Sequence, residues 1–199
     1  MWLNLEQLED RCVPSVTLTN GHLNIVNDQG LGISAGVSQA NGSSQISVSV
    51  DEQDGTGSHS YCYDVAKVKE IDFTGGAGDW NVFVNVTAIN CVATGGTDDG
   101  GNSDLEGGSG TNYLYGEAGT NYLFAGTGTY SELHAGGDKN FLYAGSCHQT
   151  EEYGTGDDTF FHGTASSPDS TSFADIYLNG ASSDYIYLDT LSSRDNIYP

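Results

Sequence analysis

The sequence has little positive charge: 5 lysines and arginines stand against 27 aspartates and glutamates in 199 residues, which gives a net charge of −22. A protein that binds the nucleic-acid backbone needs a basic surface, so this composition excludes nucleic acid as a main partner and disfavours an anionic membrane surface. Like charges in such excess repel one another in a compact fold. Divalent cations are the simplest counter-charge, and we expect them as partners.

Long apolar runs are also missing. No segment is long and apolar enough for a transmembrane helix, so we expect no membrane span. The opening segment from Met1 to Arg11 lacks the charged start and apolar core of a signal peptide. The chain nevertheless contains 12 Tyr, 7 Phe and 2 Trp. These are more large rings than a disordered chain usually has, and they predict an ordered core.

Cysteines are few and widely spaced, at positions 12, 62, 91 and 147. The absence of a C-x-x-C pair excludes a zinc knuckle. If the protein is exported, three pairings into disulfides are open, and buried or free thiols fit the sequence equally well.

The first half of the chain is patterned as β-structure. After an N-terminal segment over 1–15, residues 16–50 alternate between apolar and polar side chains, with turn clusters such as Asn20-Gly21 and Asn41-Gly42 between the runs. Residues 51–60 are interpreted as a polar loop, 65–73 as a strand with a bulge, and 80–86 as another strand. We therefore expect a β-rich N-terminal region over 16–97.

From residue 98 to residue 199 the chain repeats with a period of nine. Glycine recurs at the second and fourth places, and the clearest copies are 107–115, 116–124, 135–143, 153–161 and 179–187. The eighth place is apolar, at Leu105, Leu114, Leu123, Leu142, Phe160 and Ile186. The sixth place holds Ser103, Asn112, Asn121, Tyr130, Asn140, Gln149, Asp158 and Asp184.

Such a period is typical of a solenoid, because one nonapeptide cannot bury its apolar side chain alone and must stack on its neighbours. Each unit predicts a glycine turn followed by a short strand whose eighth-place side chain points inward. Two units make a coil of about 18 residues, each coil advances about 4.8 Å, and 98–199 holds about five coils.

These nonapeptides resemble the G-G-x-G-x-D-x-U-x calcium repeats of RTX (haemolysin-type) proteins. The segment Gly75-Gly-Ala-Gly-Asp79 looks like a further partial copy, and Leu5 to Arg11 resembles an N-terminal motif of bacterial secreted and surface proteins. The resemblance implies an all-β protein in which a β-rich N-terminal region precedes a right-handed parallel β-roll or β-solenoid. It also implies Ca²⁺ in the turns and an extracellular or cell-surface location.

The sixth place departs from the family, whose aspartate is replaced by Asn112, Asn121, Tyr130, Asn140 and Gln149. Calcium requires 6–8 oxygens, with carboxylates supplying charge. We therefore expect the asparagines to form a structural ladder of amides and expect few, weak calcium sites toward the C-terminus. The candidate metal-binding residues are Asp138, Asn140, Gly154, Gly156, Asp157, Asp158, Asp175 and Asp184.

Catalytic motifs are weak. Gly32 to Gly36 matches the nucleophile elbow G-x-S-x-G, with Ser34 as the serine, but a β pattern follows where that motif needs a helix. We expect no catalytic residue and no enzymatic activity. The leading hypothesis is a calcium-binding protein with a structural or interaction role.

The alternative is a glycan-binding or glycan-acting solenoid that uses rows of aromatic rings, such as Tyr122 and Phe141, and has extracellular polysaccharide or cell-surface components as partners. An ice- or surface-binding solenoid is a third class. Flat rows of threonine would favour it, and Thr111, Thr120 and Thr129 only approach one.

Overall fold

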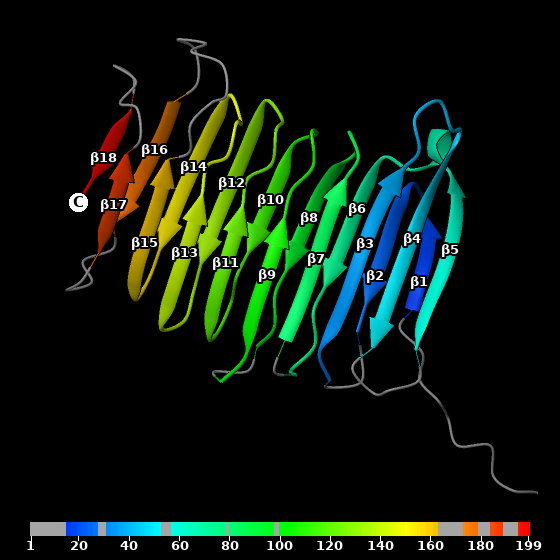
Figure 1. Ribbon diagram of the computed structural model, residues 1–199, viewed down its shortest axis with the longest axis horizontal. Helices are drawn as coiled ribbons and strands as arrows, with labels where there is room; N and C mark the ends of the chain where they lie inside the picture. The colour runs from blue at the N-terminus through cyan, green and yellow to red at the C-terminus, as the bar shows by residue number, and fades with distance from the viewer. Residues whose placement is uncertain are drawn as a thin grey trace, which may run out of the picture.

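The structure is a computed structural model, which describes residues 15–27, 31–52, 57–78, 80–97, 100–162, 173–178, 184–188 and 195–199. The described chain is almost entirely β-structure, with one short 3-10 turn, η1 (Val65–Lys67). Parallel strands stack as the coils of a β-solenoid (Figure 1), which confirms the predicted fold class.

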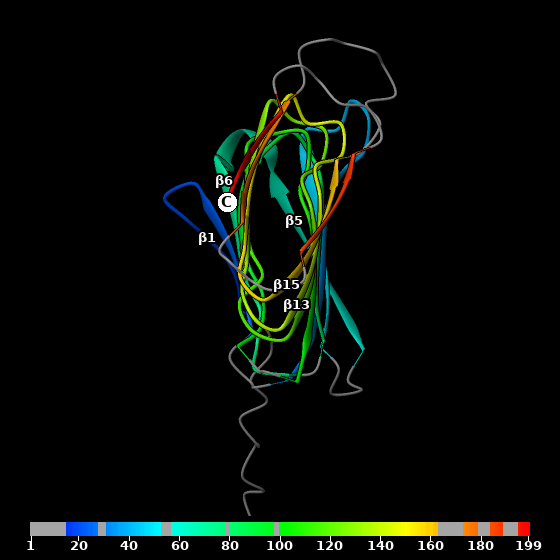
Figure 2. The same cartoon turned by 90° about the vertical axis from the view of Figure 1, so that its left-hand side faces the viewer.

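Two nine-stranded sheets form the long sides of the coil (Figure 2). Sheet A contains, in spatial order, β1 (Ser15–Thr19), β2 (His22–Val26), β6 (Glu70–Thr74), β8 (Asn90–Thr94), β10 (Asn112–Tyr115), β12 (Tyr130–Ala135), β14 (Gln149–Gly154), β16 (Phe173–Leu178) and β18 (Asn196–Tyr198). Sheet B contains β17 (Tyr185–Leu188), β15 (Asp157–His162), β13 (Lys139–Tyr143), β11 (Thr120–Phe124), β9 (Asn102–Glu106), β7 (Trp80–Val86), β3 (Ile33–Gln39), β4 (Gln45–Glu52) and β5 (Ser58–Asp64).

The parallel ladder crosses residue 98 without interruption. Strand β8 pairs with β10 in sheet A, and β7 pairs with β9 in sheet B, both in parallel. The parallel pairing extends back to β2 and β6 and to β3 and β7. Coils therefore begin well before the nonapeptide repeat becomes visible in the sequence.

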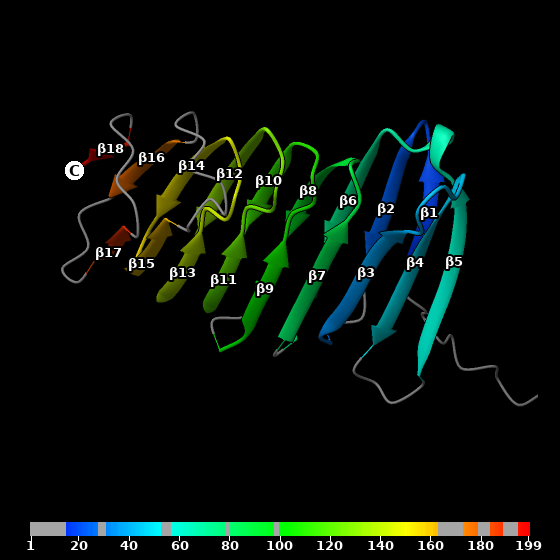
Figure 3. The same ribbon diagram turned by 45° about the horizontal axis from the view of Figure 1, so that its top comes forward.

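Antiparallel strands close the N-terminal end of the solenoid (Figure 3). Strand β1 pairs with β2, and β3, β4 and β5 form an antiparallel meander at the edge of sheet B. The hydroxyl of Tyr63 donates a hydrogen bond to the carbonyl of Val16 across 3.0 Å, which joins the outer strands of the two sheets. Strand β5 lies partly in the expected polar loop, and residues 65–67 form the 3-10 turn rather than a strand.

The core runs along the axis between the sheets. Alternate side chains of each strand point inward, and the predicted eighth-place residues Leu105, Leu114, Leu123, Leu142 and Phe160 are all fully buried. Ile186, in the last coil, is half-buried. At the other end, Phe73 and Phe83 stack with their ring centroids 4.9 Å apart. The prediction that these eighth-place residues point inward is confirmed for the first five.

The nine-residue register is wrong by one position in part of sheet A. Asn112 pairs with Ser131 and Ser131 with Thr150, so the inward polar column passes through Ser131 and Thr150 rather than the expected Tyr130 and Gln149. These steps are 19 residues long, and the extra residue lies in the turn before each strand. A one-residue slip inside a strand would turn every side chain to the other face, so the turn absorbs the insertion.

Candidate metal sites in the solenoid turns

The amide of Asn112 crosslinks the turns around it. Its Oδ1 accepts a hydrogen bond from the backbone of Gly108 at 3.0 Å. Its Nδ2 lies within 3.2 Å of the carbonyls of Gly108, Gly110 and Ala125 and also reaches the Ser131 hydroxyl. An amide nitrogen has two protons, and here they face converging carbonyl oxygens. That arrangement needs no cation.

In sheet B the sixth-place residues form a continuous ladder. The Nδ2 of Asn121 donates to Oδ1 of Asn140 across 2.8 Å, and the Nδ2 of Asn140 donates to Oδ1 of Asp158 across 2.6 Å. All three side chains are buried. The predicted amide ladder is therefore confirmed for Asn121 and Asn140, and it ends on a carboxylate, whereas Asn112 lies in sheet A and is not part of it.

Asp158 marks a change in the chemistry of this ladder. It is 1% exposed, and its backbone N–H donates to Oδ1 of Asp184 in the next coil across 3.2 Å. Burial raises the pKa of Asp158 to about 6; the hydrogen bond from Asn140 opposes this, and the charges of Asp184 and Asp157 add to it. The last two coils of this ladder thus carry carboxylates, Asp158 and Asp184, at the position where the preceding coils carry an asparagine amide.

Glycines shape the turn beside Asp158. A Cβ at Gly154 would overlap the Asp158 carboxylate, so this position requires glycine for space. Gly156 has a φ of +108°, which glycine adopts most readily. Asp138 and Asp157 are exposed in stacked turns, and the backbone N–H of Asp157 donates to the carbonyl of Asp138 across 3.0 Å.

The predicted metal residues therefore divide into two groups. Seven of the eight lie around the start of strands β13, β15 and β17 in sheet B: Asp138, Asn140, Gly154, Gly156, Asp157, Asp158 and Asp184. Asp175 lies in β16 of sheet A, where it pairs with Glu151 and accepts a hydrogen bond from Asn196. The structure does not bring Asp175 together with the others.

The outer face of sheet A has a row of carboxylates formed by Glu132, Glu151 and Asp175, which occupy paired positions on β12, β14 and β16. The hydroxyl of Tyr130 donates to Glu132 at 3.0 Å, and the hydroxyl of Tyr153 donates to Glu151 at 2.8 Å. Burial and these hydrogen bonds raise the pKa of both tyrosines. The row is therefore a set of carboxylates held by protein donors.

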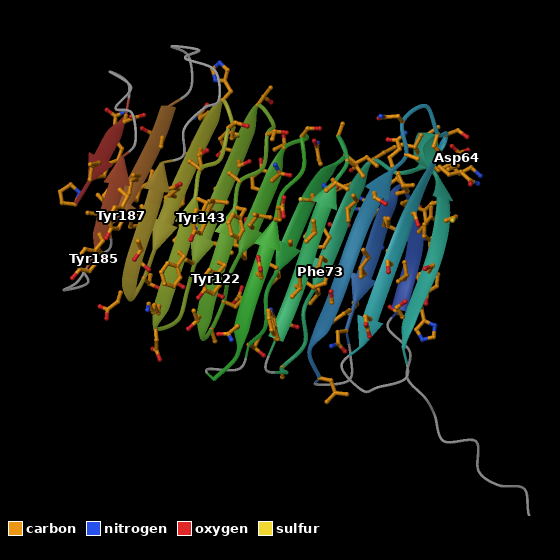
Figure 4. All side chains as sticks on the ribbon, viewed as in Figure 1. Asp64, Phe73, Tyr122, Tyr143, Tyr185 and Tyr187 are labelled. Atoms are coloured by element: carbon orange, nitrogen blue, oxygen red, sulfur yellow. The ribbon has the colours of Figure 1, made fainter. Side chains whose placement is uncertain are left out.

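Aromatic rings on both outer faces stack on one another along the axis. In sheet A the column is Tyr115, His134, Tyr153, Tyr177 and Tyr198, with successive centroids 4.5 to 5.0 Å apart. In sheet B, Tyr122 stacks on Phe141 and Phe124 on Tyr143. Figure 4 shows Tyr122 and Tyr143 on the same sheet. Each ring covers the face of the next, so mainly ring edges are exposed along these columns.

One buried carboxylate was missed by sequence reasoning. Glu152 lies in the inward column of sheet A between Leu133 and Ile176 and is 0% exposed. Within the part of the chain that the structure describes, neither of its carboxylate oxygens has a hydrogen-bond partner. Burial, followed by the charge of Asp195, raises its pKa well above the ordinary glutamate value. The signal that could have found it is the spacing of 19 residues from Leu114 to Leu133. A second step of the same length leads to Glu152, but the nine-residue pattern does not contain this spacing.

A second cluster was also missed. His22 on β2 lies beside Glu70 and Asp72 on β6, and one donor atom from each lies within 4.8 Å of the other two. A segment that contains β3, β4, β5 and η1 separates these strands in the chain, so no short motif could indicate that they meet.

The dismissed catalytic motif lies in a strand. Ser34 is exposed within β3, where it pairs with Asp51 and Val82. A turn and β4 follow, which is not the strand–turn–helix context of a nucleophile elbow. Of the cysteines within the described residues, Cys62 is exposed while Cys91 and Cys147 are buried, and all three are free. Cys12 and the segment Met1 to Arg11 lie outside the described residues.

Comparisons with protein-family models, with curated proteins and with solved structures give no match. None of the helical structure within the described residues has the length and apolar character that crossing a membrane requires.

Proposed function

We propose that this protein is a secreted or cell-surface β-solenoid with a structural or interaction role, and that its C-terminal coils bind Ca²⁺. The observation that carries the proposal is the buried Asp158 carboxylate in register with Asp184. The role is non-enzymatic, with rigid sheet faces as the surfaces offered to partners.

The coil around Asn112 and the coils with Asp158 and Asp184 differ in whether the protein itself supplies hydrogen-bond donors to the turn oxygens. At Asn112 the Nδ2 protons already satisfy the turn carbonyls, and a cation would have to displace them. Asp158 has no such protons, and its neighbour Asp184 adds negative charge. Two carboxylates and nearby backbone carbonyls are hard oxygen ligands of the kind that Ca²⁺ prefers.

No lysine or arginine in the described part of the chain neutralises the Asp158–Asp184 pair. Among the described residues, the ion pairs all involve histidine, and no lysine or arginine pairs with Asp158 or Asp184. Lys139 is on the adjacent strand β13, but its Nζ lies 5.0 Å from the centroid of Phe141 on the outer face. A bound divalent cation would supply the missing positive charge.

A glycan-binding role is the second candidate, and one observation favours it. Tyr185 and Tyr187 on β17 are 59% and 57% exposed, and both are on the outer face of sheet B (Figure 4). Exposed rings at the end of a sheet can stack on sugar rings. The inner part of the aromatic columns favours it less, because those ring faces cover one another.

Calcium titration of thermal stability tests the proposal. With a Kd of about 10⁻⁴–10⁻³ M, as in weak extracellular sites, about 10 mM Ca²⁺ should stabilise the fold by roughly 1–3 kcal/mol. D158N should lose most of that gain, whereas D51N, at an exposed aspartate of β4, should keep it. Equal calcium gains in D158N and the wild type would refute this placement.

Amide hydrogen exchange locates the effect. Calcium should increase protection across 138–190 and leave 107–124 unchanged, because the amides of Asn112 and Asn121 hold the latter coil without metal. A parallel pull-down with insoluble polysaccharides, using a variant with Tyr185 and Tyr187 changed to Ala, tests the glycan candidate. Binding that this variant loses would favour the second function.

A further inference from the structure

We propose a second metal site at the other end of the solenoid, where His22, Glu70 and Asp72 form a three-ligand centre for a borderline divalent cation such as Zn²⁺. This site is separate from the calcium turns in position and in ligand chemistry. It includes an imidazole nitrogen, which Ca²⁺ does not favour and Zn²⁺ does.

Strand pairing places the three side chains on the outer face of sheet A. Strand β2 runs parallel to β6, with His22 opposite Glu70 and Asn24 opposite Asp72. Glu70 and Asp72 are two residues apart on β6, so they project from the same face. The imidazole of His22 reaches both carboxylates from the neighbouring strand.

The three side chains already converge on one point as an ion-paired cluster, with one ligand atom from each within 4.8 Å of the other two. Nδ1 of His22 lies 2.8 Å from Oδ2 of Asp72, which is an ordinary hydrogen bond, and 3.4 Å from Oε1 of Glu70. The second distance is too long for a good hydrogen bond. Ligands bound tetrahedrally to Zn²⁺ at about 2.0–2.1 Å lie roughly 3.3 Å apart, so a modest shift of these side chains, which opens the His22–Asp72 pair, would bring the three ligand atoms to that spacing.

The charges are also suitable. Two carboxylates and a neutral imidazole balance the charge of one divalent cation, and half of the His22 side chain is exposed, which leaves room for water as the fourth ligand. Lys69 packs on Gly21 in the preceding turn, and among the described residues it forms no ion pair with these carboxylates. The net charge of −22 raises the local concentration of cations further.

Isothermal titration with ZnCl₂ tests this site in the full chain. The buffer should hold physiological salt and millimolar CaCl₂, so that weak oxygen sites are already occupied. Loss of even an outer-shell partner typically costs about 10–100-fold in metal affinity, so H22Q, E70Q and D72N should each weaken Zn²⁺ binding at least about tenfold.

The matched control is H134Q. His134 also lies on the outer face of sheet A, but it contacts a single carboxylate, that of Glu132 on its own strand. H134Q should bind Zn²⁺ as the wild type does. Zn²⁺ affinity that is unchanged in H22Q, or that falls equally in H134Q, would overturn the proposal.

A spectroscopic readout separates this site from general binding to an acidic surface. In long-range ¹H–¹⁵N spectra, one equivalent of Zn²⁺ should shift the Nδ1 resonance of His22 and leave the other histidine rings unchanged. A shift of another ring first would place the site elsewhere. Because the calcium turns contain no histidine ligand, failure of this experiment leaves the calcium proposal standing, and the reverse is also true.

Discussion

Asn140 donates its amide nitrogen to the carboxylate of Asp158 across 2.6 Å, and both side chains are buried between the sheets. This contact joins the part of the ladder that satisfies itself with amides to the part that carries negative charge. The coils on the carboxylate side of this contact should therefore respond to pH and to metal, and the coils on its amide side should respond much less.

The pH dependence at Asp158 follows from its raised pKa. Its value of about 6 in the folded state, against 3.8 as the ordinary value, means that the folded protein holds the proton more tightly. The stabilisation is therefore present at acid pH and is lost as pH rises through about 6. In calcium-free urea unfolding, the stability of the wild type relative to D158N should fall by about 2 kcal/mol between roughly pH 4.5 and pH 7.5. A pH-independent difference would contradict the assignment.

Converting the buried amide of Asn112 in sheet A to a carboxylate should make that coil depend on metal. In N112D, a carboxylate replaces Nδ2 protons that now face the carbonyls of Gly108, Gly110 and Ala125. Buried oxygens facing one another without a donor should destabilise the fold by about 2 kcal/mol or more without metal. Millimolar Ca²⁺ should return part of that loss in thermal unfolding. N112A is the control: it should be destabilised and should gain nothing from Ca²⁺ beyond what the wild type gains.

The inward leucines should carry much of the stability. Leu114, Leu123, Leu142 and Phe160 are fully buried in the core. Truncation of each to Ala should destabilise the protein by roughly 2–5 kcal/mol in urea unfolding, as in other well-packed cores. Tyr185, which is 59% exposed on β17, provides the contrast, and Y185A should change the stability far less. Near-zero losses at all four core positions would contradict the register.

The nine-residue pattern predicted the core of sheet B because glycine turns keep a nearly constant length there. Asn121, Asn140 and Asp158 meet in the structure as the pattern predicts. In sheet A the pattern fails after Leu114, because the turns before β12 and β14 each contain one extra residue. The sequence shows that a residue has been inserted, but it does not show whether the insertion lies in the turn or in the strand. The burial of Glu152 follows from that shift.

The N-terminal coils were predicted as strands without their stacking. Val82 and Phe83 alternate in the way that a strand with one buried face requires, but their parallel partners lie on either side of a hairpin, β4 and β5, in the sequence. Alternation fixes which face of a strand is buried and leaves its neighbours undetermined. The meeting of His22 with Glu70 depends on that pairing, so only the structure shows it.

Replacing Glu152 with leucine should stabilise the protein. Leu133 and Ile176 lie on either side of Glu152 in the inward column, so E152L continues an apolar ladder with a side chain of similar size. It also removes a buried carboxylate whose two oxygens have no hydrogen-bond partner among the described residues. Replacing buried ion pairs by well-packed hydrophobic residues is often neutral or stabilising by about 1–4 kcal/mol in other proteins, and for this unpaired carboxylate we expect a gain within about that range at pH 8.

The gain in E152L should depend on pH in a defined direction. Because burial raises the pKa of Glu152 well above its ordinary value, the wild type keeps this carboxyl protonated to higher pH and becomes less stable as pH rises and the group ionises. The difference in unfolding free energy between E152L and the wild type should therefore be smaller near pH 4.5 than at pH 8. E152Q removes the charge but keeps a polar group, so it should give the pH-independent part of the effect alone. If E152L is no more stable than the wild type at pH 8, the Glu152 carboxylate has a hydrogen-bonding or ionic partner in solution. That partner would then explain why the inward column of sheet A tolerates a carboxylate.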